Sequence, residues 1–193
     1  MPTYVLIIIL IVLVYFFGKI IYLNSPSDRT TPKNKPVPPE YVVDLGYSAK
    51  RMKDDVQMLA STIGIRSIFH PNKLKQAKNY IQSRLEEFGD VKEYPYIYDD
   101  TEVANLELDI FSGSSDEGIF IIGAHYDTVS TTPGADDNAS AIAVLLELAR
   151  LAKRLKKEEK LKNNLKFLAF TLEEPPAFDT NEMGSRQYVK ILK

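Results

Sequence analysis

The sequence predicts an α/β fold, a mostly parallel mixed sheet with flanking helices, preceded by one N-terminal transmembrane helix. An apolar strand-like segment at 118–124, a helix-like segment at 139–151 and a second apolar strand-like segment at 165–171 follow one another. This order is typical of a βαβ unit, whose two strands are parallel. The 193 residues are 45% hydrophobic and 26% charged, which is enough apolar material for one globular core.

Residues 1–23 are predicted to be a transmembrane anchor. The stretch 4–23 is apolar except for Lys19, and about 20 such residues can cross a bilayer as a helix. Lys19 lies near the end of the stretch, so its amine can reach the interface. No basic residue precedes the apolar run and no small-x-small cleavage site follows it, which favours an anchor over a cleaved signal peptide. We therefore expect a single-pass membrane protein with the lipid bilayer as one partner.

The side of the membrane on which the domain lies is left open. The basic residues near the anchor all follow it, which favours a cytoplasmic domain: Lys19, Arg29, Lys33 and Lys35. Acidic neighbours and the length of the domain weaken that interpretation. Residues 24–40 are rich in Pro, Ser, Thr and Asn, so we expect an extended linker. Residues 41–193 would then form the folded domain.

Two amphipathic helices and two strands are expected before the βαβ unit. Apolar residues recur every three or four positions in 48–63 and in 74–85, and Gly89 would stop the second helix. Within 91–111 the apolar and polar residues alternate, which predicts two strands.

The βαβ unit itself shows two kinds of apolar pattern. Every residue of 118–124 is apolar, which is typical of a strand covered on both faces. The segment 139–151 is apolar around much of its circumference and is followed by a basic stretch, which predicts a largely buried helix with a solvated end.

Composition excludes several classes of function. The net charge is −2 and we find no dense cluster of Lys and Arg, so nucleic acid is not expected as a partner. The chain has no Cys, which excludes disulfides, thiolate zinc sites and cysteine nucleophiles. Any metal must therefore be bound by imidazole and carboxylate groups.

Three polar clusters lie at the ends of the βαβ elements. His125-Tyr126-Asp127 follows the first strand, the acidic run 133–138 precedes the helix, and Glu173-Glu174 follows the second strand. Each alone has an ordinary explanation: a surface loop, a helix cap or a solvated turn. Ligands in open α/β sheets bind at the carboxyl ends of the strands, so the three together favour a functional site.

These residue types are suited to hydrolysis by a water molecule that zinc activates. Zinc binds imidazole nitrogen and carboxylate oxygen, and two zinc ions about 3.5 to 4 Å apart share a bridging carboxylate. A further carboxylate must then accept the proton of the attacking water. One His, one acidic run and two consecutive Glu supply such a set.

The runs GAHYDTVSTTPGADDNASAIAVLLELAR, FLAFTLEE and MGSRQYV resemble the zinc aminopeptidase family, which also contains glutamate carboxypeptidases and the transferrin-receptor ectodomain. The resemblance implies two Zn²⁺ ions and peptide or protein N-termini as substrates. It implies that His125 binds one zinc, Asp136 bridges both, Glu174 binds the second and Glu173 is the general base. Asp127 would orient His125. The peptide bond Asp136–Asp137 would be cis.

The resemblance also implies ligands that this sequence does not supply. The family has another acidic ligand and another His well beyond the G-S-x-x-Y segment, which is Gly184 to Tyr188 here and ends close to Lys193. Asp179 lies in the wrong place for such a ligand, and His70 is expected in a loop. We therefore expect an N-terminal fragment or a truncated copy of the catalytic domain.

Three functions compete. The leading hypothesis is a membrane-anchored zinc metallo-exopeptidase that removes N-terminal residues. The second is a catalytically inactive membrane-anchored module on the same fold, which the missing ligands favour. The third is a glutaminyl-cyclase-like acyltransferase, which ranks last because those enzymes use a Trp-containing pocket and this chain has no Trp.

Overall fold

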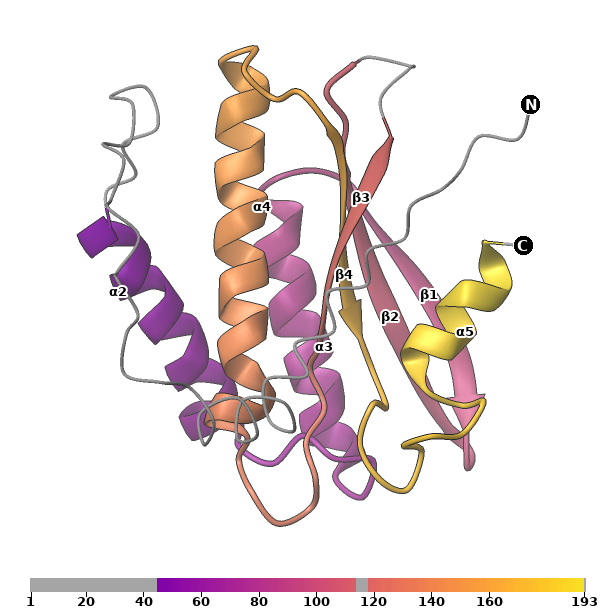
Figure 1. Cartoon of the computed structure of the whole chain (residues 1–193). Helices are drawn as coiled ribbons and strands as arrows, with labels where there is room; N and C mark the ends of the chain where they lie inside the picture. The colour runs from indigo at the N-terminus through magenta and orange to yellow at the C-terminus, as the bar shows by residue number, and fades with distance from the viewer. Residues whose placement is uncertain (1–44, 114–117, 193) are drawn as a thin grey trace, which may run out of the picture.

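The structure is a computed structural model that describes residues 45–113 and 118–192. The predicted anchor at 4–23 and the linker at 24–40 lie outside the described residues. Within the described ranges, no helix combines the length and apolarity needed to cross a membrane. The fold is α/β, with one four-stranded sheet between helices, as the sequence predicts (Figure 1).

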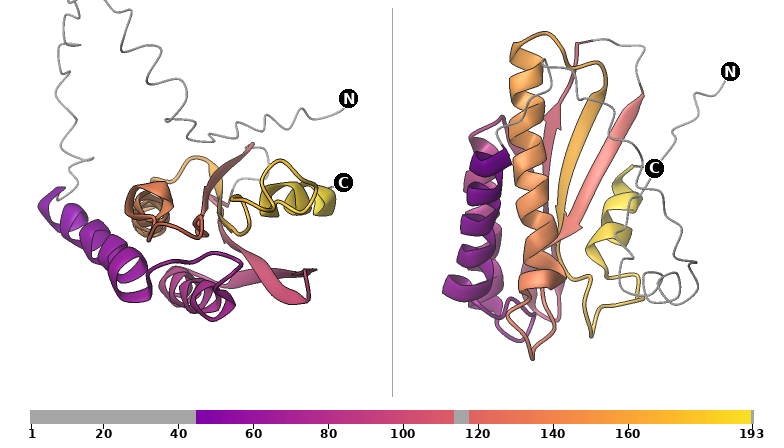
Figure 2. Two further views of the ribbon diagram at one scale, coloured as in Figure 1. Left: turned by 90° about the horizontal axis from the view of Figure 1, so that it is seen from below. Right: turned by 60° about the vertical axis from the view of Figure 1, so that its left-hand side comes forward.

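The expected elements are present in the expected order. The helical elements are α2 (Leu45–Val56), η2 (Gln57–Ile63), α3 (Pro71–Glu86), η3 (Ala135–Ser140), α4 (Ala141–Lys157) and α5 (Gly184–Ile191). The strands are β1 (Val91–Tyr98), β2 (Thr101–Ile110), β3 (Ile119–His125) and β4 (Asn164–Phe170). Figure 2 shows α2, α3 and α4 on one face of the sheet and α5 on the other.

The sheet order is β1-β2-β4-β3, and the sheet is mixed rather than mostly parallel. β1 pairs with β2, and β2 with β4, in antiparallel fashion; only β3 and β4 run parallel. The prediction of a mostly parallel sheet is therefore wrong for the described strands. The reason is local: Asp99 and Asp100 join β1 to β2 with positive φ angles of 45° and 58°, and such two-residue turns connect antiparallel neighbours.

The βαβ prediction is confirmed. β3 and β4 pair in parallel from Ile119 opposite Asn164 to His125 opposite Phe170, and α4 lies between them in the chain. The predicted cover on both faces of this first strand is wrong, however. β3 is the edge of the described sheet, and Ile119 and Phe120 are 41% and 44% exposed. An all-apolar run specifies burial only when neighbouring elements are there to supply it.

The hydrophobic core lies between the sheet and the helices α3 and α4. Leu106 and Leu108 of β2 are fully buried, as are Ile81 of α3 and Ile142 of α4. Alternate residues of β2 point to the other face, where Glu107 accepts a hydrogen bond from Tyr188 of α5. Packing on both faces of the sheet thus holds the strands in place, and with them the strand ends from which the polar loops extend.

Candidate metal centre

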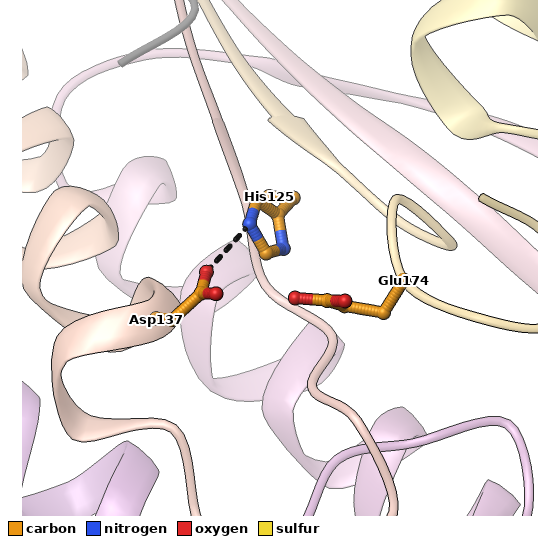
Figure 3. A group of neighbouring side chains, drawn as sticks. All are labelled: His125, Asp137 and Glu174. Atoms are coloured by element: carbon orange, nitrogen blue, oxygen red, sulfur yellow. Dashed lines mark ion pairs between the residues drawn. The ribbon is translucent and has the colours of Figure 1, made fainter. Parts of the chain in front are cut away.

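Three polar loops meet at the carboxyl ends of the parallel strands. His125 is the last residue of β3, Asp137 lies in η3 just before α4, and Glu174 follows β4. Figure 3 shows their side chains converging from these three segments. Each offers one ligand atom, and these atoms lie within 4.8 Å of one another. The βαβ unit therefore assembles the site that the motif order predicts.

The acidic residue at the centre is Asp137 and not the predicted Asp136. His125 Nε2 lies 3.1 Å from Asp137 Oδ1. Both aspartates are exposed, but only Asp137 belongs to the cluster of described residues that could bind a metal. The cis peptide bond is also one residue later than the resemblance implies, at Asp137–Asn138. Adjacent side chains point in different directions here, so a shift of one residue changes which carboxylate lies beside His125.

Asp127 connects two of the loops. Its carboxylate is buried, and Oδ1 lies 3.3 Å from His125 Nδ1. The same carboxylate accepts hydrogen bonds from the backbone N–H groups of Glu173 at 3.1 Å and Glu174 at 3.0 Å. One side chain thus orients the imidazole and fixes the loop that carries both glutamates.

Glu173 is placed beside the cluster rather than in it. Its Oε1 accepts a hydrogen bond from the Ser185 backbone N–H at 2.6 Å, and its Oε2 accepts one from the Ser185 hydroxyl at 3.0 Å. Ser185 lies in the first turn of α5, where backbone N–H groups favour a negative partner. Burial raises the pKa of Glu173, and the two bonds from Ser185 oppose that rise. A carboxylate that is held in place beside the three candidate metal ligands in this way can accept a proton.

The pKa values of the cluster reflect its crowded charges. Burial alone lowers the pKa of His125, but the carboxylates of Asp127 and Asp137 reverse this and raise it to about 10. His125 in turn lowers the pKa of Asp137. Burial, together with the nearby charge of Asp137, raises the pKa of Glu174 to about 7. Two carboxylates that face each other in this way are stabilised by a cation between them.

The residues fit zinc. One imidazole and two carboxylates form the nitrogen-and-oxygen donor set that zinc prefers in the absence of thiolates. His125 Nδ1 is buried and forms no hydrogen bond of standard geometry, although it lies beside Asp127. A metal on Nε2 would place the proton on Nδ1, where Asp127 could accept it.

Two other predicted positions lie away from this centre. His70 precedes α3, and its Nδ1 lies 2.9 Å from Ser67 Oγ, so the loop assignment is confirmed. The carboxylate of Asp179 accepts a hydrogen bond from Arg186 at 2.7 Å. Neither joins the cluster formed by the described residues.

Sequence reasoning missed three residues that shape the site: Arg66, Asn105 and Ser185. Asn105 Nδ2 donates to the carbonyl of Gly184 at 2.8 Å, while its Oδ1 accepts from the Thr171 N–H at 3.0 Å, so it joins the end of β4 to the start of α5. In the sequence Asn105 is marked only as a polar residue between Ala104 and Leu106. Arg66 gave a similar signal, as a charged residue among apolar neighbours.

Comparisons with known proteins point to a family of peptidases. Residues 105–193 match the profile of peptidase family M28. The chain is 34% identical over 155 residues to the uncharacterized protein YfbL of Escherichia coli, covering 76% of this chain and 46% of YfbL. It is 38% identical over 74 residues to aminopeptidase YwaD of Bacillus subtilis, covering 38% of this chain and 14% of YwaD. The chain thus spans less than half the length of these curated relatives.

Solved structures show the same fold. A protein assigned as a zinc-dependent exopeptidase from Bacteroides vulgatus matches with a TM-score of 0.54 at 27% identity, covering 74% of this chain and 53% of that one. An Acidobacteriales glutaminyl cyclase matches with a TM-score of 0.58 at 14% identity, covering 87% and 56%, which shows the fold alone. The predicted resemblance is confirmed at the level of the family: residues 105–193 of this chain match peptidase family M28, and the solved structures that match include a zinc-dependent exopeptidase.

Proposed function

We propose that the chain carries the zinc-binding and base residues of a membrane-anchored metallo-exopeptidase of the aminopeptidase type. The observation that supports this most is the convergence of His125, Asp137 and Glu174 at the carboxyl ends of the parallel strands, with Glu173 beside them. In this proposal His125, Asp137 and Glu174 would hold zinc, His125 and Glu174 as ligands on either side and Asp137 as the carboxylate between them.

The chemistry assigned to the chain's own residues is proton transfer and orientation. Zinc, when bound, would polarise the scissile carbonyl and lower the pKa of a water molecule. Glu173 would accept a proton from that water as its oxygen bonds to the carbonyl carbon. Glu173 would then donate the proton to the amine nitrogen as the carbon–nitrogen bond breaks. Asp127 would hold the His125 ring and the Glu173 backbone in one arrangement.

The test combines zinc content with hydrolysis. The full chain, purified in detergent and supplied with zinc, is expected to bind the metal and to hydrolyse an aminoacyl p-nitroanilide. The Glu173→Gln variant should retain zinc and lose hydrolysis, because the amide cannot accept the proton. Full activity of Glu173→Gln would refute the role of the base, whereas zinc binding without any hydrolysis by the wild type would favour the inactive module.

The glutaminyl-cyclase-like alternative receives support only from the fold. The Acidobacteriales cyclase that matches in structure is 14% identical, and the chain has no Trp for the pocket that those enzymes use. Conversion of an N-terminal glutaminyl peptide to its cyclised product, measured beside the p-nitroanilide, distinguishes the two activities.

The membrane anchor is also part of the proposal and rests on the apolar run at 4–23. The full chain should sediment with membranes and resist extraction at high salt. A variant without residues 1–23 should remain in the supernatant, and co-sedimentation of that variant would contradict the anchor.

A further inference from the structure

Arg66 lies between η2 and α3, and its side chain is fully buried. Its guanidinium donates hydrogen bonds to backbone carbonyls only. Two acceptors belong to its own part of the chain, Leu59 at 2.9 Å and Gly64 at 3.0 Å, and they share the two N–H groups of Nη1 with a third acceptor, Pro133. Burying a charged group costs free energy unless its N–H donors form hydrogen bonds. The carbonyls must therefore stay within hydrogen-bonding distance of the guanidinium.

The other three acceptors lie 60 to 68 residues away in the chain and belong to the two loops of the candidate metal centre. Arg66 Nε donates to the Tyr126 carbonyl at 2.8 Å, Nη1 to that of Pro133 at 2.6 Å and Nη2 to that of Gly134 at 3.0 Å. Tyr126 directly follows the ligand His125, and Gly134 lies three residues before the ligand Asp137. One planar group therefore binds both ligand-bearing loops at once.

The backbone of Arg66 contributes a second connection to the same region. Its N–H donates to Thr128 Oγ1 at 3.0 Å, and its carbonyl accepts from the Thr128 N–H at 3.4 Å. Thr128 is buried and comes directly after Asp127. The His125 loop is therefore fixed by Arg66 through both its backbone and its side chain.

The two loops also approach Arg66 very closely at Gly134, whose φ of 57° favours glycine. A Cβ atom built there would lie 2.4 Å from Thr128 Cγ2, 3.0 Å from Arg66 Nη2 and 2.3 Å from the carbonyl oxygen of Asp137. The contact leaves no room for a side chain. The spacing between the loops is therefore set at this point of contact and not by the metal ligands alone.

We propose that Arg66 is a positioning residue that sets the separation between the His125 loop and the Asp137 loop, so that the zinc ligands are arranged before metal binds. The inference rests on the proposed zinc centre. Arginine suits this role better than lysine, because its planar fork offers five N–H donors in fixed directions, whereas an ammonium group offers three around one point.

The test compares Arg66→Lys with Arg84→Lys in the full chain. Arg84 is a control arginine: its side chain is 24% exposed, and the hydrogen-bond acceptors of its guanidinium among the described residues are Asp55 and Glu87, neither of which belongs to the two loops. Amide hydrogen exchange of residues 127–138 is measured on the metal-free protein, and the zinc dissociation constant by competition with a chromophoric chelator. Circular dichroism checks that each variant is folded.

The expected result is faster exchange in 127–138 and zinc binding weakened about tenfold or more for Arg66→Lys, as for the loss of other groups that orient metal ligands. Arg84→Lys should leave both values at the wild-type level. Thr128→Val, which removes one acceptor of Arg66 with little change of volume, should shift both values in the same direction by less.

The outcomes separate this inference from the proposed function. Unchanged exchange in 127–138, or unchanged zinc affinity despite faster exchange, would overturn the role of Arg66. If Arg66→Lys fails to fold, Thr128→Val decides the question by the same two measurements. If the wild-type chain binds no zinc, the proposed metal centre is refuted, and the exchange data alone decide whether Arg66 positions the loops.

Discussion

The carboxylate of Glu173 accepts two hydrogen bonds from Ser185, one from the backbone N–H at 2.6 Å and one from the hydroxyl at 3.0 Å. Ser185 lies at the start of α5, on the face of the sheet opposite α3 and α4 (Figure 2). The proposed base is therefore held by an element outside the βαβ unit that supplies the metal ligands.

Replacement of Ser185 by alanine should lower the kcat of peptide hydrolysis about tenfold. The change removes the hydroxyl donor and leaves the backbone donor, and a hydrogen bond to a charged group contributes about 1.5 to 3 kcal/mol. Steady-state kinetics should show KM unchanged, and elemental analysis should show the same zinc content. Ser185→Thr, which keeps a hydroxyl, should recover most of kcat. A wild-type kcat for Ser185→Ala would remove this role from Ser185.

Asp137 and Asp136 should differ sharply when each is changed to asparagine. Asp137 lies 3.1 Å from His125 Nε2, so Asp137→Asn should weaken zinc binding by at least about tenfold. Asp136 lies outside the cluster of described residues that could bind a metal, so it should tolerate the change with little effect. Isothermal titration calorimetry measures both affinities. The opposite ranking would restore Asp136 as the ligand.

Zinc binding should release protons at neutral pH. In the metal-free protein the pKa of His125 is raised to about 10 and that of Glu174 to about 7, so the imidazole is protonated and the carboxyl partly so. A zinc ligand must be neutral imidazole or ionised carboxylate, so the affinity should rise as the pH increases toward about 10. Calorimetry in two buffers of different ionisation enthalpy measures the release. The same apparent enthalpy in both buffers would contradict it.

Gly184→Ala should destabilise the protein by about 1 to 3 kcal/mol through overpacking. A Cβ at this position would lie 2.2 Å from the Thr171 carbonyl oxygen and 2.4 Å from Asn105 Oδ1. The contact holds α5 against the end of β4, so Glu173 should also lose its fixed partner. Urea unfolding measures the free energy. Gly118→Ala is the control, because a Cβ there meets no described heavy atom within 4 Å and stability should be unchanged.

Much of the fold could be predicted from local patterns. Helical periodicity placed α2, α3 and α4, and the order strand, helix, strand placed His125 and Glu174 at one edge of the sheet. These inferences succeed because the spacing of apolar residues determines which face of an element is buried, and because parallel strands end at the same edge. The resemblance to family M28 was likewise readable from short motifs.

The tertiary structure decided which of two adjacent acidic residues lies beside His125 and how exposed β3 is, because local patterns specify neither. Asp136 and Asp137 are equivalent as adjacent acidic residues, and only the backbone course from Gly134 into α4 turns the second toward His125. The exposure of β3 depends on which strands lie beside it, since an apolar sequence carries no information about its neighbours.

Arg66 shows most clearly the difference between what the sequence determines and what only the folded structure determines. The sequence alone determined that imidazole and carboxylate side chains follow one another in the order that resembles a zinc peptidase. It could not determine that a guanidinium 60 residues before Tyr126 would bind the carbonyls of both ligand loops. Every residue type has a backbone carbonyl, so the residue types in a sequence do not indicate which carbonyls a buried guanidinium will bind. These hydrogen bonds form only when the chain has folded.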